Sequence, residues 1–282
     1  MRHRVAVETR VLAGLHAVHA WPVGSSRERR VLFVHGMFGG AWVWDHWIGD
    51  FAARGWDCWA VTLGRPDRHP NLEARAWGLG NDVADVAAAM IALGGPALVG
   101  HSLGGLLVLK VAERTSPSAV VALAPALPRG MLALRHLALL GVALRRAPAL
   151  ARGRPLVPER RLLERLALHR LDGVTRERVW RRLVPESGQR ALGVVLPGVR
   201  LEPRRIDAPA LFVAAGADRL TPASMVRRVA RRYGAPCYEY ARLGHMIPLE
   251  PEWPLVGGDV AGWLLADSEA RAGSSSVRLL HT

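Results

Sequence analysis

The sequence predicts an α/β fold with a mostly parallel central sheet and helices on both faces. Short apolar segments alternate with longer segments of helical periodicity, and most of the short segments are continuously apolar. Continuous apolar strands are expected where a parallel sheet is covered on both faces. The chain has 282 residues, of which 50% are hydrophobic. This length and composition suit one or two globular domains and exclude a disordered, collagen-like or coiled-coil chain.

The predicted strands and helices follow one another in a regular order. After an N-terminal hairpin, at about Val5 to Trp21, the expected strands are Val31 to His35, Asp57 to Leu63, Pro96 to His101, Ala119 to Ala124, Pro209 to Ala215 and Pro236 to Tyr240. The expected helices are Asp45 to Arg54, Asn81 to Leu93, Leu103 to Arg114, Thr221 to Tyr233 and Trp253 to Leu265. Asn81 and Thr221 are predicted to be N-caps, because their side chains can accept a hydrogen bond from an unpaired amide of the first turn, and Pro222 then takes the first helical position after Thr221.

One connection is much longer than a crossover requires. Residues 127–205 separate two predicted strands, and the segments Glu159 to Leu171 and Thr175 to Val184 within them are amphipathic. A further segment, Met131 to Arg146, is apolar on most faces. We therefore expect a helical cap formed by residues 127–205 on a core formed by residues 1–126 and 206–266. Residues 267–282 include a run of glycine and serine and are predicted to form a flexible tail.

A glycine-rich motif lies at residues 100–105, with the sequence Gly-His-Ser-Leu-Gly-Gly, between a predicted strand and a predicted helix. A serine on such a sharp turn needs small residues two positions before and two positions after it, here Gly100 and Gly104. Its hydroxyl is then presented at a helix N-terminus, where backbone amides favour developing negative charge. The strand and helix on either side favour a nucleophilic Ser102 over an incidental serine in a turn.

With this motif, the chain resembles the α/β-hydrolase superfamily over about residues 25–265. In that family the acid and the histidine follow the nucleophile in sequence. Residues 209–222, which contain Asp218, resemble the acid-bearing segment, and residues 243–248, which contain His245, resemble the histidine loop. The resemblance implies the α/β-hydrolase fold and a catalytic set of Ser102, Asp218 and His245. In chemical terms, a histidine can take the proton of a weakly nucleophilic serine, and an aspartate can fix the tautomer of that histidine.

Residues 35–40, His-Gly-Met-Phe-Gly-Gly, follow the first predicted parallel strand and resemble the oxyanion loop of the same family. The match implies that the backbone amides of Met37 and Leu103 donate to the oxyanion. Phe38 is a less favoured alternative to Met37. Gly36 leaves room for the backbone to approach a bound carbonyl group.

Several other site types lack support in the sequence. The glycine-rich segments do not have the spacing of a dinucleotide fingerprint, and neither a phosphate-binding loop nor a His-Glu-x-x-His motif occurs. We therefore expect neither a cofactor nor a catalytic metal. The two cysteines, Cys58 and Cys237, are too few for a disulfide framework. Together with the absence of an export signal and of a long apolar run, they favour a cytoplasmic protein.

The net charge of +14 is concentrated in one segment. Residues 127–205 contain 18 arginines and six acidic residues, whereas the rest of the chain is nearly balanced. This distribution does not favour nucleic acid binding. Three interpretations of the arginines stay open: contact with anionic membrane headgroups, capture of an anionic substrate, or solvated helix faces.

The leading functional prediction is a cofactor-independent serine hydrolase that cleaves a carboxylic ester or a related acyl bond of a small hydrophobic substrate. The same residues could serve an acyltransferase, a thioesterase or a hydroxynitrile-lyase-like enzyme, and a non-enzymatic ligand receptor can use the same fold. Serine at the nucleophile position argues against the aspartyl-ester chemistry of haloalkane dehalogenases and epoxide hydrolases. The sequence does not indicate an oligomeric state.

Overall fold

The central feature of the computed structural model is an eight-stranded sheet in the order β1-β2-β4-β3-β5-β6-β7-β8. The structure describes residues 2–24, 26–64, 77–131, 146–150, 152, 154–195 and 199–278. Strands β1 and β2 form the predicted N-terminal hairpin, and β2 pairs antiparallel with β4, whereas the remaining neighbours are parallel. The strands are Val5–Leu12 (β1), Leu15–Pro22 (β2), Arg30–Val34 (β3), Asp57–Val61 (β4), Ala97–His101 (β5), Val120–Leu123 (β6), Ala210–Ala215 (β7) and Cys237–Tyr240 (β8).

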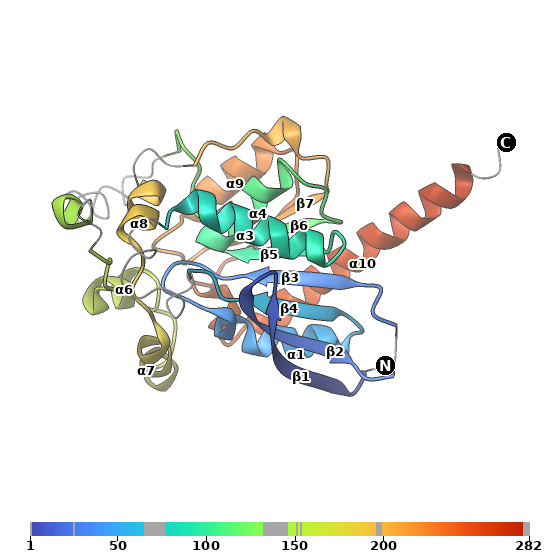
Figure 1. The fold of residues 1–282 in the computed structure, drawn as a ribbon, viewed down its shortest axis with the longest axis horizontal. Helices are drawn as coiled ribbons and strands as arrows, with labels where there is room; N and C mark the ends of the chain where they lie inside the picture. The colour runs from blue at the N-terminus through green and yellow to red at the C-terminus, as the bar shows by residue number, and fades with distance from the viewer. Residues whose placement is uncertain are drawn as a thin grey trace.

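Helices cover both faces of this sheet, as predicted. Helices α3, α4 and α9 lie on one face, and α1 and α10 lie on the other (Figure 1). Helices α6, α7 and α8 follow β6 in the chain and lie together at one side of the sheet. The helices are Asp45–Ala53 (α1), Leu79–Ala92 (α3), Leu103–Ala112 (α4), Arg160–Leu166 (α6), Gly173–Arg182 (α7), Gly188–Val195 (α8), Ala223–Arg232 (α9) and Trp253–Arg278 (α10), and the 3₁₀ turns are Ala41–Trp44 (η1), Pro203–Arg205 (η2) and Ile247–Leu249 (η3).

Alternation along the central strands divides the core into two hydrophobic layers. In β3, Leu32 and Val34 belong to the layer that α3, α4 and α9 cover, whereas Val31 and Phe33 belong to the layer that α1 and α10 cover. Successive side chains of a strand point to opposite faces, so a strand that is buried on both faces must be apolar at every position. Each fully buried side chain of this size contributes about 1.5–3 kcal/mol to folding. The core thereby holds the carboxyl ends of β3 and β5 side by side.

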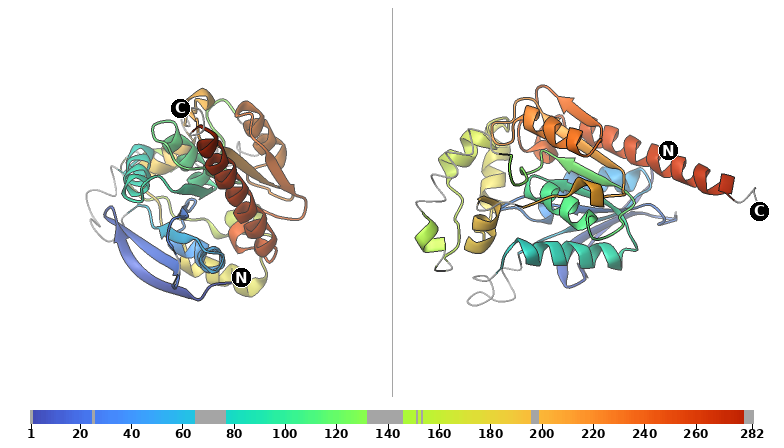
Figure 2. Two further views of the ribbon diagram at one scale, coloured as in Figure 1. Left: turned by 90° about the vertical axis from the view of Figure 1, so that its right-hand side faces the viewer. Right: turned by 90° about the horizontal axis from the view of Figure 1, so that it is seen from above.

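Three local predictions are wrong. Helix α10 does not end near Leu265 but continues to Arg278, through the segment predicted to be a flexible tail. Residues 266–272 contain no proline and are rich in alanine and charged residues, which favour a helix. Figure 2 shows that this helix projects beyond the sheet. Asn81 is not the N-cap of α3, because the helix begins earlier and Asn81 Oδ1 accepts a hydrogen bond from the N-cap residue Gly78. Thr221 is not the N-cap of α9 either, because that helix begins at Ala223 and its N-cap is Pro222.

The long connection between β6 and β7 contains α6, α7 and α8, so the helical character predicted for two of its segments is confirmed. The expected apolar helix Met131 to Arg146 falls almost entirely outside the described residues. Within the described part of the chain, every helix is too short or too polar to cross a membrane.

Candidate active site

Ser102 lies on the predicted sharp turn, between the end of β5 and the start of α4. Its backbone has φ 54° and ψ −117°, a conformation that residues with a side chain rarely adopt. A Cβ atom at Gly104 would overlap the carbonyl oxygen of Val34, and one at Gly100 would overlap the backbone of Gly104. The small residues on either side therefore allow the strand, the turn and the helix to approach closely enough to form this elbow.

The structure brings Ser102, His245 and Asp218 together in one chain of contacts. His245 Nε2 lies 3.0 Å from Ser102 Oγ, and His245 Nδ1 lies 2.8 Å from Asp218 Oδ2. Because a carboxylate is an acceptor, Nδ1 donates to Asp218, and Nε2 is left to accept the proton of the serine hydroxyl. Asp218 and His245 are each 3% exposed, so both are shielded from bulk water.

Backbone amides fix the carboxylate of Asp218. Its Oδ1 atom accepts hydrogen bonds from the amide of Leu220 at 2.7 Å and from the amide of Thr221 at 2.8 Å. These contacts leave Oδ2 directed at His245. Charge-assisted hydrogen bonds to backbone amides stabilise an ionised carboxylate, so Asp218 is suited to balance a positive charge on the imidazole.

Two buried residues that the sequence did not single out hold the loop of His245. His101 Nε2 donates to the carbonyl oxygen of His245 at 2.8 Å. Burial, followed by the nearby His245, lowers the pKa of His101 to about 3, so its ring is neutral. Glu250 Oε2 accepts a hydrogen bond from the amide of Gly244 at 2.7 Å. A side chain at Gly244 would place its Cβ 2.9 Å from the other oxygen of Glu250, so the loop packs closely on this carboxylate.

Glu250 leads to a prediction about stability and pH. Its side chain is fully buried, and this burial raises the pKa of its carboxyl group. The stabilising contribution of an acid with a raised folded-state pKa is complete below its ordinary pKa and is lost as the pH rises through the raised value. We expect Glu250→Gln to gain stability relative to wild type between about pH 3 and about pH 8, by about 1.4 kcal/mol if the pKa of Glu250 is raised by about one. Urea midpoints of both proteins at the two pH values measure this change, and an equal difference at both would contradict it.

The loop from His35 to Gly40 passes directly beside Ser102. A Cβ atom at Gly36 would lie 2.9 Å from Ser102 Cβ. His35 Nε2 accepts a hydrogen bond from the amide of Leu63 at 3.0 Å. The ring proton therefore lies on Nδ1, which donates to the carbonyl oxygen of Gly36 at 2.7 Å. Burial, together with the positive charge of Arg190, lowers the pKa of His35 to about 4 and keeps this tautomer neutral.

The amide of Phe38 is already bound by a buried side chain. It donates to Glu186 Oε1 at 2.6 Å. An amide that donates to a carboxylate cannot also point at a substrate oxygen. Met37, rather than Phe38, is therefore the better candidate for the oxyanion donor on this loop, together with Leu103 at the first position of α4.

A small hydrophobic cluster joins residues 160–185 to the loops of Asp218 and His245. Met246 directly follows His245, and Leu220 lies two positions after Asp218, so apolar residues from the long connection pack against both loops. The buried members are Ala167, Leu168, Leu171, Val179 and Met246, and the partly buried ones are Trp42, Leu163, Leu183, Leu220 and Leu249.

The comparisons with known proteins agree with this fold. A sequence model described as the alpha/beta hydrolase family matches residues 31–253. The match spans most of the chain, and the protein therefore belongs to the α/β hydrolase family. The predicted family and fold are confirmed. A search of curated protein sequences finds no match.

Solved structures of several esterases and lipases are similar to this chain. The monoacylglycerol lipase of Paleococcus ferrophilus is 23% identical with a TM-score of 0.67, and the alignment covers 95% of this chain and 100% of that one. The enol-lactonase from Burkholderia xenovorans LB400 is 15% identical with a TM-score of 0.70, covering 92% and 100%. The naproxen esterase from Bacillus subtilis is 15% identical with a TM-score of 0.67, covering 93% and 92%. At these identities the similarity shows the shared fold.

Proposed function

We propose that this protein is a serine hydrolase that cleaves a carboxylic ester or a related acyl bond of a small hydrophobic substrate. The observation that carries the proposal is the contact chain from Ser102 Oγ through His245 to Asp218, at 3.0 Å and 2.8 Å. Membership of the α/β hydrolase family and the esterases and lipases among its structural relatives support it. The two free cysteines support placement in a reducing cytoplasm.

The proposed reaction has two stages. In the first stage, His245 takes the proton of Ser102 as Oγ attacks the substrate carbonyl, and Asp218 stabilises the imidazolium that forms. The amides of Met37 and Leu103 donate to the tetrahedral oxyanion. His245 then protonates the leaving alcohol, and the carbon–oxygen bond breaks to leave an acyl group on Ser102. In the second stage, His245 activates a water molecule that releases the acid and restores the serine.

We also propose that residues 127–205 act as a cap that selects the substrate. The hydrophobic cluster that contains Met246 and Leu220 supports this role, because it places apolar residues of the connection beside the loops of His245 and Asp218. Apolar side chains beside a reactive serine favour a hydrophobic acyl or alcohol group over a charged one.

A substrate panel tests the proposed function directly. Purified wild type and Ser102→Ala are assayed with ester, lactone, amide and thioester substrates, with and without a competing alcohol. Hydrolysis of esters that requires Ser102 would support the proposal. Transfer to the alcohol, faster turnover of thioesters, or cleavage of a cyanohydrin would indicate the related acyl-transfer or lyase activities. Failure of Ser102 to react with a fluorophosphonate probe would indicate a non-enzymatic receptor.

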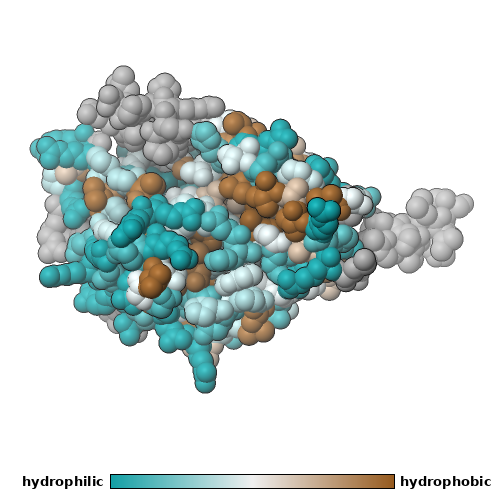
Figure 3. Space-filling view, turned by 90° about the horizontal axis from the view of Figure 1, so that it is seen from below, coloured by the Kyte–Doolittle hydropathy of each residue, from teal (hydrophilic) through white to brown (hydrophobic). Residues whose placement is uncertain are grey.

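Part of the positive charge of residues 127–205 is neutralised within the fold. Arg160 contacts Glu164 and Glu177 at 2.9 Å and 2.8 Å, and Arg182 contacts Asp45 at 2.9 Å. Figure 3 shows one face of the molecule, which is mainly hydrophilic on the side where the helices of residues 127–205 lie. The largest hydrophobic area of this face lies nearer the side from which α10 projects. Three more arginines of this segment pair with acidic residues, Arg170 with Glu252, Arg181 with Glu177 and Arg200 with Glu202.

The membrane interpretation of these arginines makes a salt-dependent prediction. We expect more protein to co-sediment with anionic vesicles than with neutral vesicles at low salt, and this difference to disappear at high salt, because salt screens attraction between exposed charges. Hydrolysis of a soluble ester is measured in parallel as a control for folding. Equal binding to both kinds of vesicle, or binding to neither, would contradict the membrane interpretation.

A further inference from the structure

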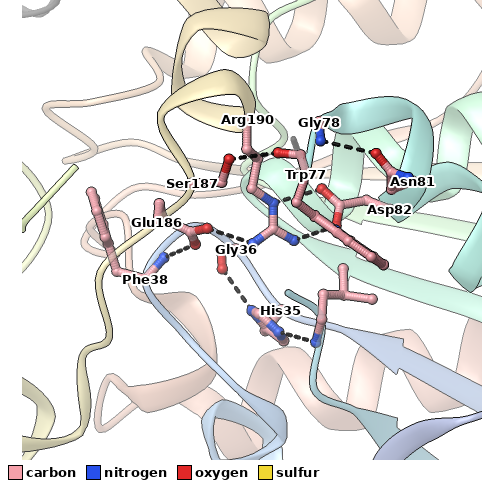
Figure 4. A network of polar contacts seen from close by, with 11 residues as sticks. His35, Gly36, Phe38, Trp77, Gly78, Asn81, Asp82, Glu186, Ser187 and Arg190 are labelled. Atoms are coloured by element: carbon pink, nitrogen blue, oxygen red, sulfur yellow. Dashed lines mark hydrogen bonds and ion pairs between the residues drawn. The ribbon is translucent and has the colours of Figure 1, made fainter. Parts of the chain in front are cut away.

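A buried arginine links the long connection to the core of the molecule. Arg190 of α8 makes two contacts with Asp82 of α3, from Nε at 2.6 Å and from Nη2 at 2.7 Å. Its Nη1 atom contacts Glu186 Oε2 at 2.5 Å. Arg190 is 2% exposed, Asp82 is fully buried and Glu186 is 4% exposed, so a single guanidinium lies between two carboxylates in the interior (Figure 4).

The second oxygen of Glu186 reaches the loop beside Ser102. Glu186 Oε1 accepts a hydrogen bond from the amide of Phe38 at 2.6 Å. The amide of Val184 donates a hydrogen bond to the carbonyl oxygen of Phe38 at 3.0 Å. Phe38 has φ 62°, in the left-handed region that costs energy for a residue with a side chain. Both backbone groups of this strained residue are therefore held by the segment that immediately precedes α8.

These contacts constrain the amide of Met37 through the geometry of the peptide unit. In a trans peptide, the C=O and N–H groups point in opposite directions. The peptide that contains Met37 N–H also contains the carbonyl of Gly36, which His35 Nδ1 fixes at 2.7 Å. The next peptide contains Phe38 N–H, which Glu186 fixes. Two consecutive peptide planes are thus held, one on each side of the Met37 α-carbon.

Arg190 allows the carboxylate of Glu186 to stay charged in its buried position beside the amide of Phe38. A buried carboxylate without a positive partner would be costly and would tend to take up a proton. Burial opposes the charge of Arg190, but the carboxylates of Glu186 and Asp82 raise its pKa above the ordinary range, so it stays protonated. Asp82 anchors the guanidinium to α3, and Trp77 Nε1 donates to Asp82 Oδ1 at 3.0 Å. A buried ion pair contributes little net stability compared with apolar packing, so its geometry is the more informative property.

We propose that Glu186, supported by Arg190 and Asp82, is a positioning residue that holds the amide of Met37 in the orientation required for the oxyanion. This inference rests on the proposed function of Ser102. It makes the connection between β6 and β7 part of the oxyanion site as well as a cover for it. A displacement of α8 relative to α3 would release Phe38 and weaken stabilisation of the transition state.

Kinetics of Glu186 variants test this role. We expect Glu186→Ala to lower kcat by about 10- to 100-fold with KM within about threefold, because a misplaced oxyanion donor acts on the transition state more than on bound substrate. The affinity for a trifluoromethyl ketone, whose adduct with Ser102 carries an oxyanion, should fall by a similar factor. Glu186→Gln keeps one oxygen that can accept a hydrogen bond from the amide of Phe38, although its amide nitrogen would face Arg190. We therefore expect kcat and ketone affinity to fall less in Glu186→Gln than in Glu186→Ala.

Glu113 provides a matched control on another part of the chain. It is a buried glutamate that also accepts a backbone amide, from Glu202 at 2.5 Å, and pairs with a cation, Lys110, at 2.6 Å. Glu113→Ala should lose stability but keep kcat and the affinity for the ketone, measured well below its melting temperature. Unchanged kcat and unchanged ketone affinity in both Glu186 variants, while Ser102→Ala is inactive, would overturn the positioning role alone. Activity that survives in Ser102→Ala would instead overturn the proposed function.

Discussion

Replacement of Ser102 by alanine is expected to lower kcat by about 10⁴-fold or more without unfolding the protein. The hydroxyl of Ser102 is the group that His245 contacts at 3.0 Å, and alanine has no atom that can attack a carbonyl carbon. The fold should survive, because alanine and serine both carry a Cβ atom and therefore meet similar steric cost at φ 54°. Steady-state hydrolysis of a reactive ester, together with circular dichroism and thermal melting, measures both parts of this prediction.

A double variant that combines Ser102→Ala with His245→Ala tests whether the two residues act together in one reaction step or contribute to kcat independently. Residues that act as a unit give non-additive losses, so Ser102→Ala, His245→Ala and the double variant should all lose about the same factor. Independent contributions would instead multiply. Turnover retained by purified Ser102→Ala, or losses that multiply in the double variant, would remove Ser102 and His245 from the proposed reaction.

The sheet could be predicted closely from the sequence because each of its strands carries a local signal. Strands β3 and β5, for example, contain the apolar runs Val31–Val34 and Ala97–Val99, are followed by glycine-containing turns, and begin and end within one residue of the prediction. The turn at Ser102 could be placed for a similar reason, since Gly100 and Gly104 are local requirements of its conformation. Asp218 and His245 could be located through the resemblance to a family, and the structure places His245 against Ser102 and Asp218 against His245.

The cluster around Arg190 could not be predicted in the same way. Arg190 and Asp82 are 108 positions apart, and α8 reads as one more arginine-containing helix in a segment with 18 arginines. Nothing local distinguishes an arginine that is 2% exposed from its solvated neighbours. Glu250 and His101 were missed for a related reason, because the backbone groups that they bind belong to a loop whose position depends on the whole sheet. The length of α10 was underestimated because glycine and serine at residues 273–276 suggested an end to the helix.

Replacement of Asp218 by asparagine is expected to lower kcat by about 10³- to 10⁴-fold, with KM changed much less. An asparagine of the same shape can still accept the amides of Leu220 and Thr221 through its oxygen. Its NH₂ group would then face His245 Nδ1, which forces that nitrogen to be an acceptor and places the proton on Nε2. A protonated Nε2 cannot take the proton of Ser102, so the variant holds the imidazole in an unproductive tautomer.

Asp57 is the matched control for this prediction. It is also a buried aspartate in contact with a buried histidine, His19, at 2.6 Å, but the pair lies on β2 and β4, away from Ser102. Asp57→Asn and Asp218→Asn remove the same negative charge from an aspartate–histidine pair, so both should lower the melting temperature. Only Asp218→Asn should lower kcat, and its reaction with a fluorophosphonate should slow in parallel because that reaction also needs an activated serine. A near-wild-type kcat for Asp218→Asn would move the acid role to another residue, and equal losses of kcat in the two variants would assign the effect to stability.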